Sequence, residues 1–444
     1  MRQKRFYLAG IVFALGLILT GFLLDAPKNI LPGLETILRS QDVLITDYIE
    51  LAGPGAAFVN SGLVTLISLG LMWTFREPMN GSCIMELGLM AGFALFGKNI
   101  LNIWPILIGT WLFSCLKREP FGKFTSVALL ATSLSPLVSF AGLNTGWDNP
   151  SLGLFLGMLV GFVAVPLSDY TYRIQNGMNL YNMGFACGLL AMVIVPLMSA
   201  VNRAPQRANY WATGYDLPLG IMLGGFCAAL IGSGLLIGRK KALKRYWGLL
   251  HMSGRSPSDF LRMFGAGATL INMGVNGAAA TAFILITGGD LNGPTVGCIF
   301  TVIGWSAFGK HVRNILPLMA GVLLGSLVFH FHINDPAVQI ASLLCTALAP
   351  ISGSFGWPFG VLAGFLHSAL VLQAGSVAEG VNLYNNGFSG GLLAIVLYPV
   401  ISALVFRRKA MLQDKEYLDM FLGETPQSPG KEEKNHSQDI KMPH

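Results

Sequence analysis

The stretches GMNLYNMGFACGLLA (177–191) and GVNLYNNGFSGGLLA (380–394) share eleven of their fifteen residues at an offset of 203. A second pair, FGKNILNIWPILIG (96–109) and FGKHVRNILPLMAG (308–321), shares seven of fourteen residues at an offset of 212. The matched stretches follow one another in the same order in the two halves of the chain, which indicates an internal duplication. We therefore predict two homologous repeats.

The composition is that of a membrane protein. Of the 444 residues, 53% are hydrophobic and 11% are charged, and the mean hydropathy is +0.59. A soluble globular protein carries roughly a quarter charged residues, so most of this chain does not face water. Apolar runs of about 18 or more residues recur along it and predict membrane-spanning helices. We predict an all-α integral membrane protein with about 12–14 transmembrane or half-membrane helices.

The positive charges predict how the spans are oriented. The net charge is +7, and Lys and Arg gather at residues 2–5, 239–262 and 407–409. Such clusters beside apolar spans mark the cytoplasmic side of a membrane and argue against a nucleic-acid partner. We predict a multi-pass protein of the cell inner (cytoplasmic) membrane, embedded in the lipid bilayer, with both termini cytoplasmic. Threading the spans through these clusters gives the two repeats inverted topology.

The repeats divide the chain into five predicted parts. These are an N-terminal span with an extracellular loop (1–54), transmembrane repeat 1 (55–201), a connecting span with a basic cytoplasmic loop (202–266), transmembrane repeat 2 (267–409) and a disordered cytoplasmic tail (410–444).

Glycines recur at every fourth position in one span of each repeat. Small residues at this spacing let helices approach closely, so we expect them to serve packing. They are Gly153, Gly157 and Gly161 in repeat 1, and Gly356, Gly360 and Gly364 in repeat 2.

Inverted repeats are the usual plan of secondary transporters and of several channels. Segments 83–97 and 294–308 are short for a span and occupy matching places in the two repeats. Irregular backbone at membrane depth is tolerated only where protein or a water-filled cavity satisfies its polar groups. We therefore predict a solute site at the interface of the repeats.

The duplicated NLYN motif supplies the first candidate residues for that site. Amide and phenol groups bind a neutral polar solute without imposing a charge, although asparagine at this position also suits a helix-capping loop. The candidates are Asn179, Tyr181, Asn182, Asn382, Tyr384, Asn385 and Asn386.

Two serines beside prolines are further candidates. APISG (349–353) is matched by SPLVS (135–139), and a proline with a neighbouring hydroxyl adds a polar point to an apolar wall. Ser352 and Ser139 would line the path. The alternative is a proline kink with a serine bonded back to its own helix.

Four ionisable residues are candidates for coupling transport to an ion or a proton. Ionisable groups at membrane depth are expensive and suggest function. Lys98 and Lys310 occupy matched positions, whereas Glu86 and His367 are unmatched candidates for a proton relay. The alternative for the lysines is that each side chain extends from the end of a span to the membrane surface and has no part in transport.

The stretches SPLVSF…GMNLYNMGFACGLL (135–190) and APISGSFGWPFG…GVNLYNNGFSGGLLA (349–394) are similar in order and spacing to the two halves of the urea transporters. The resemblance implies a pore between inverted halves and a homo-oligomer. It places Ser352 at the pore threonine, and Asn182 and Asn385 near a motif asparagine. The chain also resembles a family of uncharacterised bacterial multi-pass membrane proteins.

These features predict a transport protein that passes a small polar solute, urea-like or amide-like, through a pore between the repeats. An ion-coupled or proton-coupled secondary transporter of a small organic solute is the alternative. A membrane-embedded enzyme or a scaffold subunit is a third class. Because no P-loop, nucleophile-elbow, zinc-protease or dinucleotide-binding motif is found, we predict that the protein is not an enzyme and uses no cofactor, catalytic residue or metal.

Overall fold

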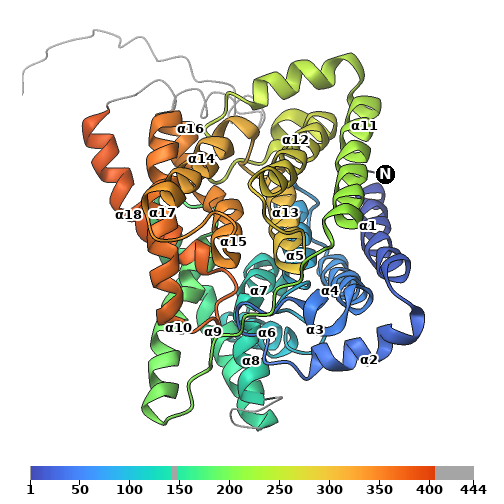
Figure 1. Ribbon diagram of the computed structural model, residues 1–444, viewed down its shortest axis with the longest axis vertical. Helices are drawn as coiled ribbons and strands as arrows, with labels where there is room; N and C mark the ends of the chain where they lie inside the picture. Colours follow the sequence, from blue (N-terminus) through green and yellow to red (C-terminus); the bar gives the residue numbers. More distant parts are fainter. Residues whose placement is uncertain (1, 143–148, 406–444) are drawn as a thin grey trace, which may run out of the picture.

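The computed structural model describes residues 2–142 and 149–405 (Figure 1). Within them the secondary structure is helical, apart from an isolated bridge between Thr46 and Tyr210. Ten helical spans among the described residues are long and apolar enough to cross a membrane, and three shorter apolar helices accompany them. The prediction of an all-α multi-pass membrane protein is confirmed. The predicted tail, 410–444, lies outside the described residues.

The first half of the chain runs through ten α-helices and two short 3-10 helices. They are α1 (Arg2–Leu24), α2 (Pro27–Leu38), α3 (Tyr48–Ala52), α4 (Pro54–Thr74), α5 (Gly81–Phe93), α6 (Trp104–Lys117), η1 (Phe121–Lys123), α7 (Thr125–Ala131), η2 (Thr132–Leu134), α8 (Ser135–Gly142), α9 (Pro150–Gln175) and α10 (Asn182–Ala200).

The second half follows the same order with fewer separate helices. It contains α11 (Asp216–Leu249), α12 (Phe260–Ile286), α13 (Gly293–Trp305), α14 (Val312–Val328), α15 (Pro336–Leu344), η3 (Cys345–Leu348), α16 (Ala349–Phe355), α17 (Trp357–Val377) and α18 (Asn385–Leu404).

The duplication extends to segments that the sequence analysis placed outside the repeats. A Cβ atom on Gly62 of α4 would lie 2.7 Å from the carbonyl oxygen of Ala14 in α1. The same contact recurs in the second half, where a Cβ atom on Gly274 of α12 would lie 2.6 Å from the carbonyl oxygen of Cys227 in α11. Helix α1 therefore corresponds to the first part of α11, and both belong to the repeated unit.

The breaks in the helices also correspond. Gly53, with φ +87°, separates α3 from α4, and Gly265, with φ +80°, breaks α12. The two glycines are 212 residues apart, and this backbone conformation is one that glycine adopts readily. Similarly, Arg239 breaks α11 near the place that corresponds to the boundary between α1 and α2. The second half thus repeats α1–α4 as two kinked helices.

Helices α5 and α13 lie against each other in the centre of the molecule (Figure 1). A Cβ atom on Gly92 would lie 2.2 Å from the carbonyl oxygen of Gly297, and one on Gly88 would lie 2.7 Å from that of Phe300. Residue numbers rise along one helix as they fall along the other, so the two helices pack antiparallel through glycines.

Helices α10 and α18 form a second contact between the two halves. A Cβ atom on Gly184 would lie 2.7 Å from the carbonyl oxygen of Tyr384, and one on Gly387 would lie 2.8 Å from that of Tyr181. The rings of Phe185 and its counterpart Phe388 stack at 5.7 Å. We call the surface along which α5, α10, α13 and α18 meet the seam.

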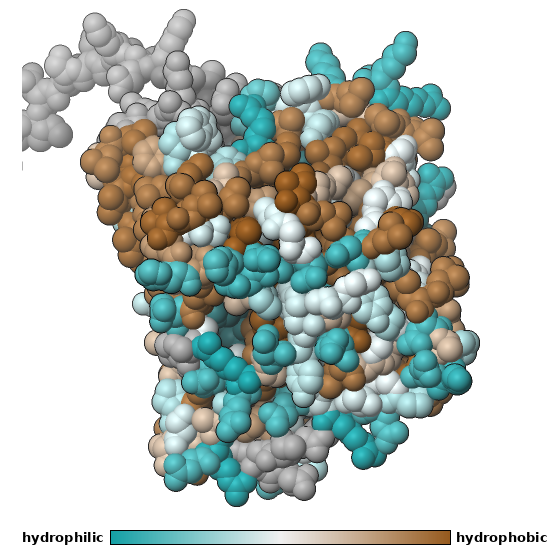
Figure 2. Space-filling view, viewed as in Figure 1, coloured by the Kyte–Doolittle hydropathy of each residue, from teal (hydrophilic) through white to brown (hydrophobic). Residues whose placement is uncertain are grey.

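The outer surface carries many exposed apolar side chains, as expected of a lipid-facing protein. Figure 2 shows apolar residues covering much of the upper part of one face, with polar residues at its upper edge. Helix α1 exposes a row of leucine, isoleucine and valine side chains, which comprises Leu8, Ile11, Val12, Leu15, Leu19 and Leu23.

Candidate functional site

The two FGK turns end α5 and α13 at the seam. Gly97 (φ +138°) and Gly309 (φ +110°) adopt positive φ angles in these turns, which carry Lys98 and Lys310 into the interior. A side chain at Gly97 would also collide with Leu383, because a Cβ atom there would lie 2.4 Å from that residue. Glycine is therefore favoured at this turn by its backbone conformation, and a larger residue would also displace the side chain of Leu383.

Asparagines on neighbouring helices satisfy the backbone of both turns. The Nδ2 atom of Asn60 in α4 donates to the carbonyl oxygens of Ala94 (2.7 Å) and Lys98 (2.8 Å). In the second half, Asn272 of α12 donates likewise to the carbonyl oxygens of Ser306 and Lys310, both at 2.7 Å. Irregular backbone in a membrane protein needs such partners, so these asparagines hold the turns that position the lysines.

Both lysines are completely buried. The Nζ atom of Lys310 donates to the hydroxyl of Tyr181 at 2.5 Å and to that of Thr346 at 2.6 Å. It also lies 4.4 Å from the centroid of the Tyr181 ring. The Nζ atom of Lys98 contacts the sulfur of Met90 at 3.3 Å. Neither lysine reaches the protein surface, so the interpretation in which they extend to the membrane surface is wrong.

Neither lysine has an acidic partner in the described part of the chain. The ion pairs found there join other residues, and the contacts of Lys98 and Lys310 are with neutral groups. A buried ammonium group without a counter-charge is costly. This pair of matched, buried lysines is therefore an unusual feature of the seam.

Four aromatic rings pack between the two lysines; we call Phe93, Tyr181, Trp305 and Tyr384 the aromatic cluster. The rings of Tyr181 and Tyr384 lie 4.8 Å apart, as do those of Phe93 and Tyr384. The ring of Trp305 lies 5.2 Å from that of Tyr181, and its Nε1 atom donates to the hydroxyl of Tyr384 at 3.3 Å. The ring of Phe93 faces Lys98 at 5.5 Å. The tyrosines predicted from NLYN thus meet at the seam, beside the lysines.

Asn179 and Asn382 cross-link the two halves. The Nδ2 atom of Asn179 donates to the carbonyl oxygen of Gly387 at 3.0 Å, and that of Asn382 donates to the carbonyl oxygen of Gly184 at 3.2 Å. Each Oδ1 atom accepts the backbone N–H of the tyrosine two residues later, at 3.1 Å. Both ends of each amide group are used inside the protein, so these asparagines hold the turns together.

The other asparagines of the motif each retain an unpartnered amide oxygen. Asn182 donates to the carbonyl oxygen of Ser168 (3.0 Å) and Asn385 to that of Val371 (3.2 Å). The Oδ1 atoms of Asn182, Asn385 and Asn386 have no hydrogen-bond partner. These acceptors are free to bind a donor group.

The remaining candidates lie in other surroundings. The hydroxyl of Ser139 donates to Asp42 at 2.6 Å, and the hydroxyl of Ser352 is buried without a partner. His367 contacts the carbonyl oxygen of Asn386 through Nε2 at 3.2 Å. Glu86 accepts a hydrogen bond from Ser126. None of these three contacts joins the lysines or the aromatic cluster. No group of three or more His, Cys, Asp or Glu able to hold a metal ion is found among the described residues.

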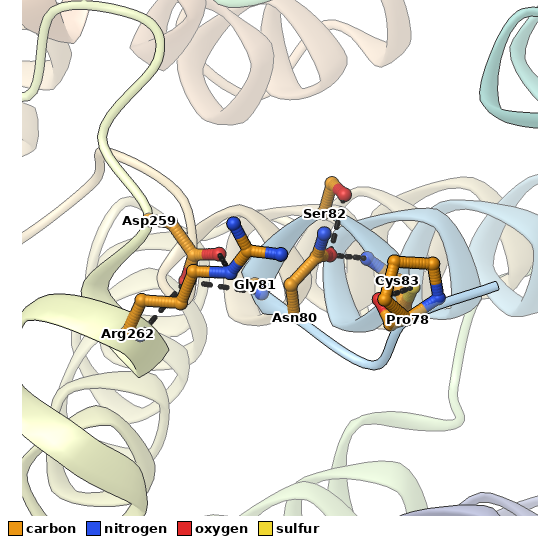
Figure 3. Close-up of polar contacts among 7 residues, drawn as sticks. All are labelled: Pro78, Asn80, Gly81, Ser82, Cys83, Asp259 and Arg262. Carbon is orange, nitrogen blue, oxygen red and sulfur yellow. Dashed lines mark hydrogen bonds and ion pairs between the residues drawn. The ribbon is translucent and has the colours of Figure 1, made fainter. Parts of the chain in front are cut away.

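Two aspartates that the sequence analysis missed connect the halves a second time. Asp259, which caps α12, accepts the backbone N–H of Gly81 at the start of α5 at 3.1 Å (Figure 3). Its counterpart Asp47, which caps α3, accepts the N–H of Gly293 at the start of α13, also at 3.1 Å. Burial raises the pKa of Asp47 to about 7. The 212-residue offset was the available signal, because it pairs these two aspartates.

We expect Asp259→Ala to destabilise the protein by about 1–2 kcal/mol, because loss of a helix-capping acceptor leaves helix N–H groups unpaired. The midpoint of thermal unfolding in detergent should fall by a few degrees. Asp169→Ala changes an exposed residue of the same type and should leave the midpoint unchanged. Equal midpoints for the two variants would contradict the capping role.

One family model matches the chain over residues 26–200 and 239–403, one stretch in each half. Its description is "Protein of unknown function (DUF1576)". Both matched stretches include α2 or its counterpart, and both begin after α1 or its counterpart in α11. Searches of curated proteins and of solved structures gave no match, so the resemblance to urea transporters has no support from them. Since the matched stretches cover more than half of the chain, the protein belongs to the DUF1576 family of proteins of unknown function.

Proposed function

We propose that this protein is a membrane transport protein with its solute site at the seam. One observation carries the proposal: Lys98 and Lys310, at matched positions in the two halves, are both fully buried and lack an acidic partner among the described residues. Retaining two such charges at membrane depth is costly. A transported anion that binds beside these lysines would offset that cost.

The proposed arrangement is a pair of inverted repeats related by a two-fold axis in the membrane plane. The antiparallel contact of α5 with α13 and the reciprocal contacts of α10 with α18 support this relation. Two halves related in this way present equivalent surfaces to opposite sides of a membrane, which suits alternating access. We retain the orientation with both termini cytoplasmic, and the cell inner membrane, as parts of the proposal.

A small organic anion is the solute class that fits the residues best. Lys310 offers an ammonium group, Tyr181 and Thr346 offer hydroxyls beside it, and the aromatic cluster offers an apolar wall. The N-termini of α10 and α18 lie at the seam without side-chain caps. Their helix dipoles add positive potential there. A carboxylate with a small apolar body would match this combination.

The burial of the site favours a carrier over a permanently open pore. Lys98, Lys310, Tyr181 and Tyr384 are each at most 1% exposed. Groups this enclosed reach water only when the halves move relative to each other. The alternative expected from the sequence, a secondary transporter of a small organic solute, is therefore the mode we propose.

A neutral, amide-like solute is the second candidate, because the seam also offers unpartnered amide oxygens. The amide oxygens of Asn182, Asn385 and Asn386 are buried and unpartnered, and they would accept hydrogen bonds from a urea-like solute. These groups carry no charge, so this candidate does not explain the lysines.

Uptake into proteoliposomes tests the proposal. The full chain is reconstituted and supplied with radiolabelled lactate, succinate, citrate, glutamate or urea, with protein-free vesicles as the control. We expect saturable uptake of at least one carboxylate and no urea flux above the control. Urea flux without carboxylate uptake would select the neutral solute instead. Absence of flux for every compound would contradict a transport function for these solute classes.

A further inference from the structure

The two halves differ at Glu86, which has no acidic counterpart in the second half. It lies in α5, one of the helices of the seam, and is completely buried. The offset of 212 pairs it with Cys298 in α13. The first half therefore holds a buried carboxyl group that the second half lacks.

The surroundings of Glu86 leave its carboxyl group incompletely paired. Its Oε1 atom accepts a hydrogen bond from the hydroxyl of Ser126, and its Oε2 atom has no partner. Helices α4 and α7, which pack against α5, carry no ionisable side chain. Helix α13 carries only Cys298, and α12 carries only Arg262, which pairs with Asp259 at 3.3 Å.

The other ionisable groups near Glu86 are also acidic or neutral. Glu77 is half-buried in the loop before α5, and Cys83 is buried in the first turn of that helix. The Sγ atom of Cys83 lies 3.9 Å from Oε2 of Glu77. Burial raises the pKa of Glu77 to about 7. Among the residues that the structure describes, no cation therefore holds Glu86 in its charged form, and a buried carboxylate without a partner is costly.

Further along α5, Met90 connects Glu86 with Lys98. Met90 follows Glu86 by one helical turn on the same face of α5, and the sulfur of Met90 contacts Nζ of Lys98 at 3.3 Å. The carboxyl group thus lies between a partly exposed acidic loop and the buried cation at the seam.

We propose that Glu86 is the proton-binding residue that couples solute transport to a proton gradient. The inference rests on the proposed transport function. A proton from the aqueous side of the Glu77 loop binds to a carboxylate oxygen of Glu86 and forms a neutral carboxylic acid. When the halves open to the other side, the same O–H bond releases the proton to water. A monocarboxylate carried with this proton adds no net charge to the buried site.

The first experiment compares gradient-driven accumulation with carboxylate exchange in the Glu86→Gln variant. Proteoliposomes are loaded and supplied with the labelled carboxylate from the panel above that the wild type takes up fastest. We expect accumulation driven by an imposed pH gradient to fall about tenfold or more. Exchange of labelled for unlabelled carboxylate at equal pH should persist, because exchange requires no net proton movement. Cys298→Ser, at the matched position, should keep both modes.

A second measurement tests proton binding without any solute. Infrared difference spectra of the reconstituted full chain, recorded after pH steps, should contain the carbonyl band of a buried carboxylic acid. The intensity of this band should fall in Glu86→Gln, leaving the contribution of other carboxyl groups such as Asp47 and Glu77, and should be unchanged in Cys298→Ser. If the wild type transports none of the solutes tested, the proposed transport function is wrong. The infrared measurement still decides whether Glu86 exchanges a proton.

Two outcomes would overturn the inference. One is unchanged gradient-driven accumulation in Glu86→Gln. The other is an infrared band whose intensity in this variant equals that of the wild type. If Glu86→Gln loses exchange as well, Glu86→Asp decides the matter. Recovery of both modes by the shorter carboxylate supports proton coupling, and failure of that variant in both modes refutes it.

Discussion

Lys310→Met should lower carboxylate uptake by about 10-fold to 100-fold, the effect of losing one charge-assisted hydrogen bond of roughly 1.5–3 kcal/mol. The substitution keeps an unbranched side chain of similar length and removes the ammonium group that faces Tyr181 and Thr346. Uptake by proteoliposomes at several solute concentrations is the measurement.

The thermal stability of the same variant separates a binding role from a structural one. Replacing a buried ion by a well-packed apolar side chain is often neutral or stabilising. We therefore expect Lys310→Met to unfold at the wild-type temperature or above it, despite the loss of uptake. Lys240→Met removes an exposed lysine of α11 and should change neither property. Uptake close to that of the wild type, together with a lowered unfolding temperature, would show that Lys310 is structural.

Lys98→Met should change uptake in the same direction. Its Nζ atom contacts a sulfur and no oxygen, so it has fewer groups to position it than Lys310 has. If both lysines stabilise the same transported anion, the two substitutions weaken the same transport process. The loss in the double variant should then be smaller than the product of the two single losses.

The sequence identified the duplication where residues are identical, and it missed the duplication where only geometry is shared. The NLYN and FGK stretches align by eye because they form turns that need particular residues at the seam. Helices α1 and α11 need only apolar side chains and a few small residues, so their sequences have diverged. Their equivalence becomes visible through matched contacts, such as those of Gly62 and Gly274.

The roles of the asparagines could not be read from their residue type. An asparagine that caps a turn and one that binds a solute use the same amide group. In the structure, Asn179 and Asn382 direct both ends of that group to backbone atoms, two of which belong to the opposite half. Sequence comparison within the chain shows that a residue is retained, while the partner that explains its retention appears only after folding.

The lysines illustrate the converse difficulty. A lysine near the end of an apolar segment ordinarily extends to the membrane surface, and the sequence places Lys98 and Lys310 near such ends. Here α5 and α13 are 13 residues each, too short to cross a bilayer of about 30 Å at about 1.5 Å per residue. Their ends therefore fall in the interior. The length of the half-helix, more than the residue itself, determines that each lysine is buried.

The largest loss of stability should come from a glycine far from the lysines. A Cβ atom on Gly161 of α9 would lie 1.9 Å from the carbonyl oxygen of Ile106 in α6. The matched Gly364 of α17 would place one 2.0 Å from the carbonyl oxygen of Leu318 in α14. A backbone oxygen cannot move aside as a side chain can, so any side chain at these positions forces two helices apart.

We therefore expect Gly161→Leu and Gly364→Leu to prevent correct folding. Even one extra methylene in a packed core costs about 1–3 kcal/mol, and leucine adds four carbon atoms. The measurement is the yield of monodisperse protein after extraction in detergent, with the unfolding temperature of any folded fraction. Gly225→Leu is the matched control, because a Cβ atom there meets nothing within 4 Å. On an exposed helix, leucine in place of glycine should stabilise by up to about 1 kcal/mol. Equal yields for Gly161→Leu and Gly225→Leu would contradict the close packing of α6 on α9. A loss confined to Gly161→Leu and Gly364→Leu would show that the paired glycines in the two halves serve the same packing role.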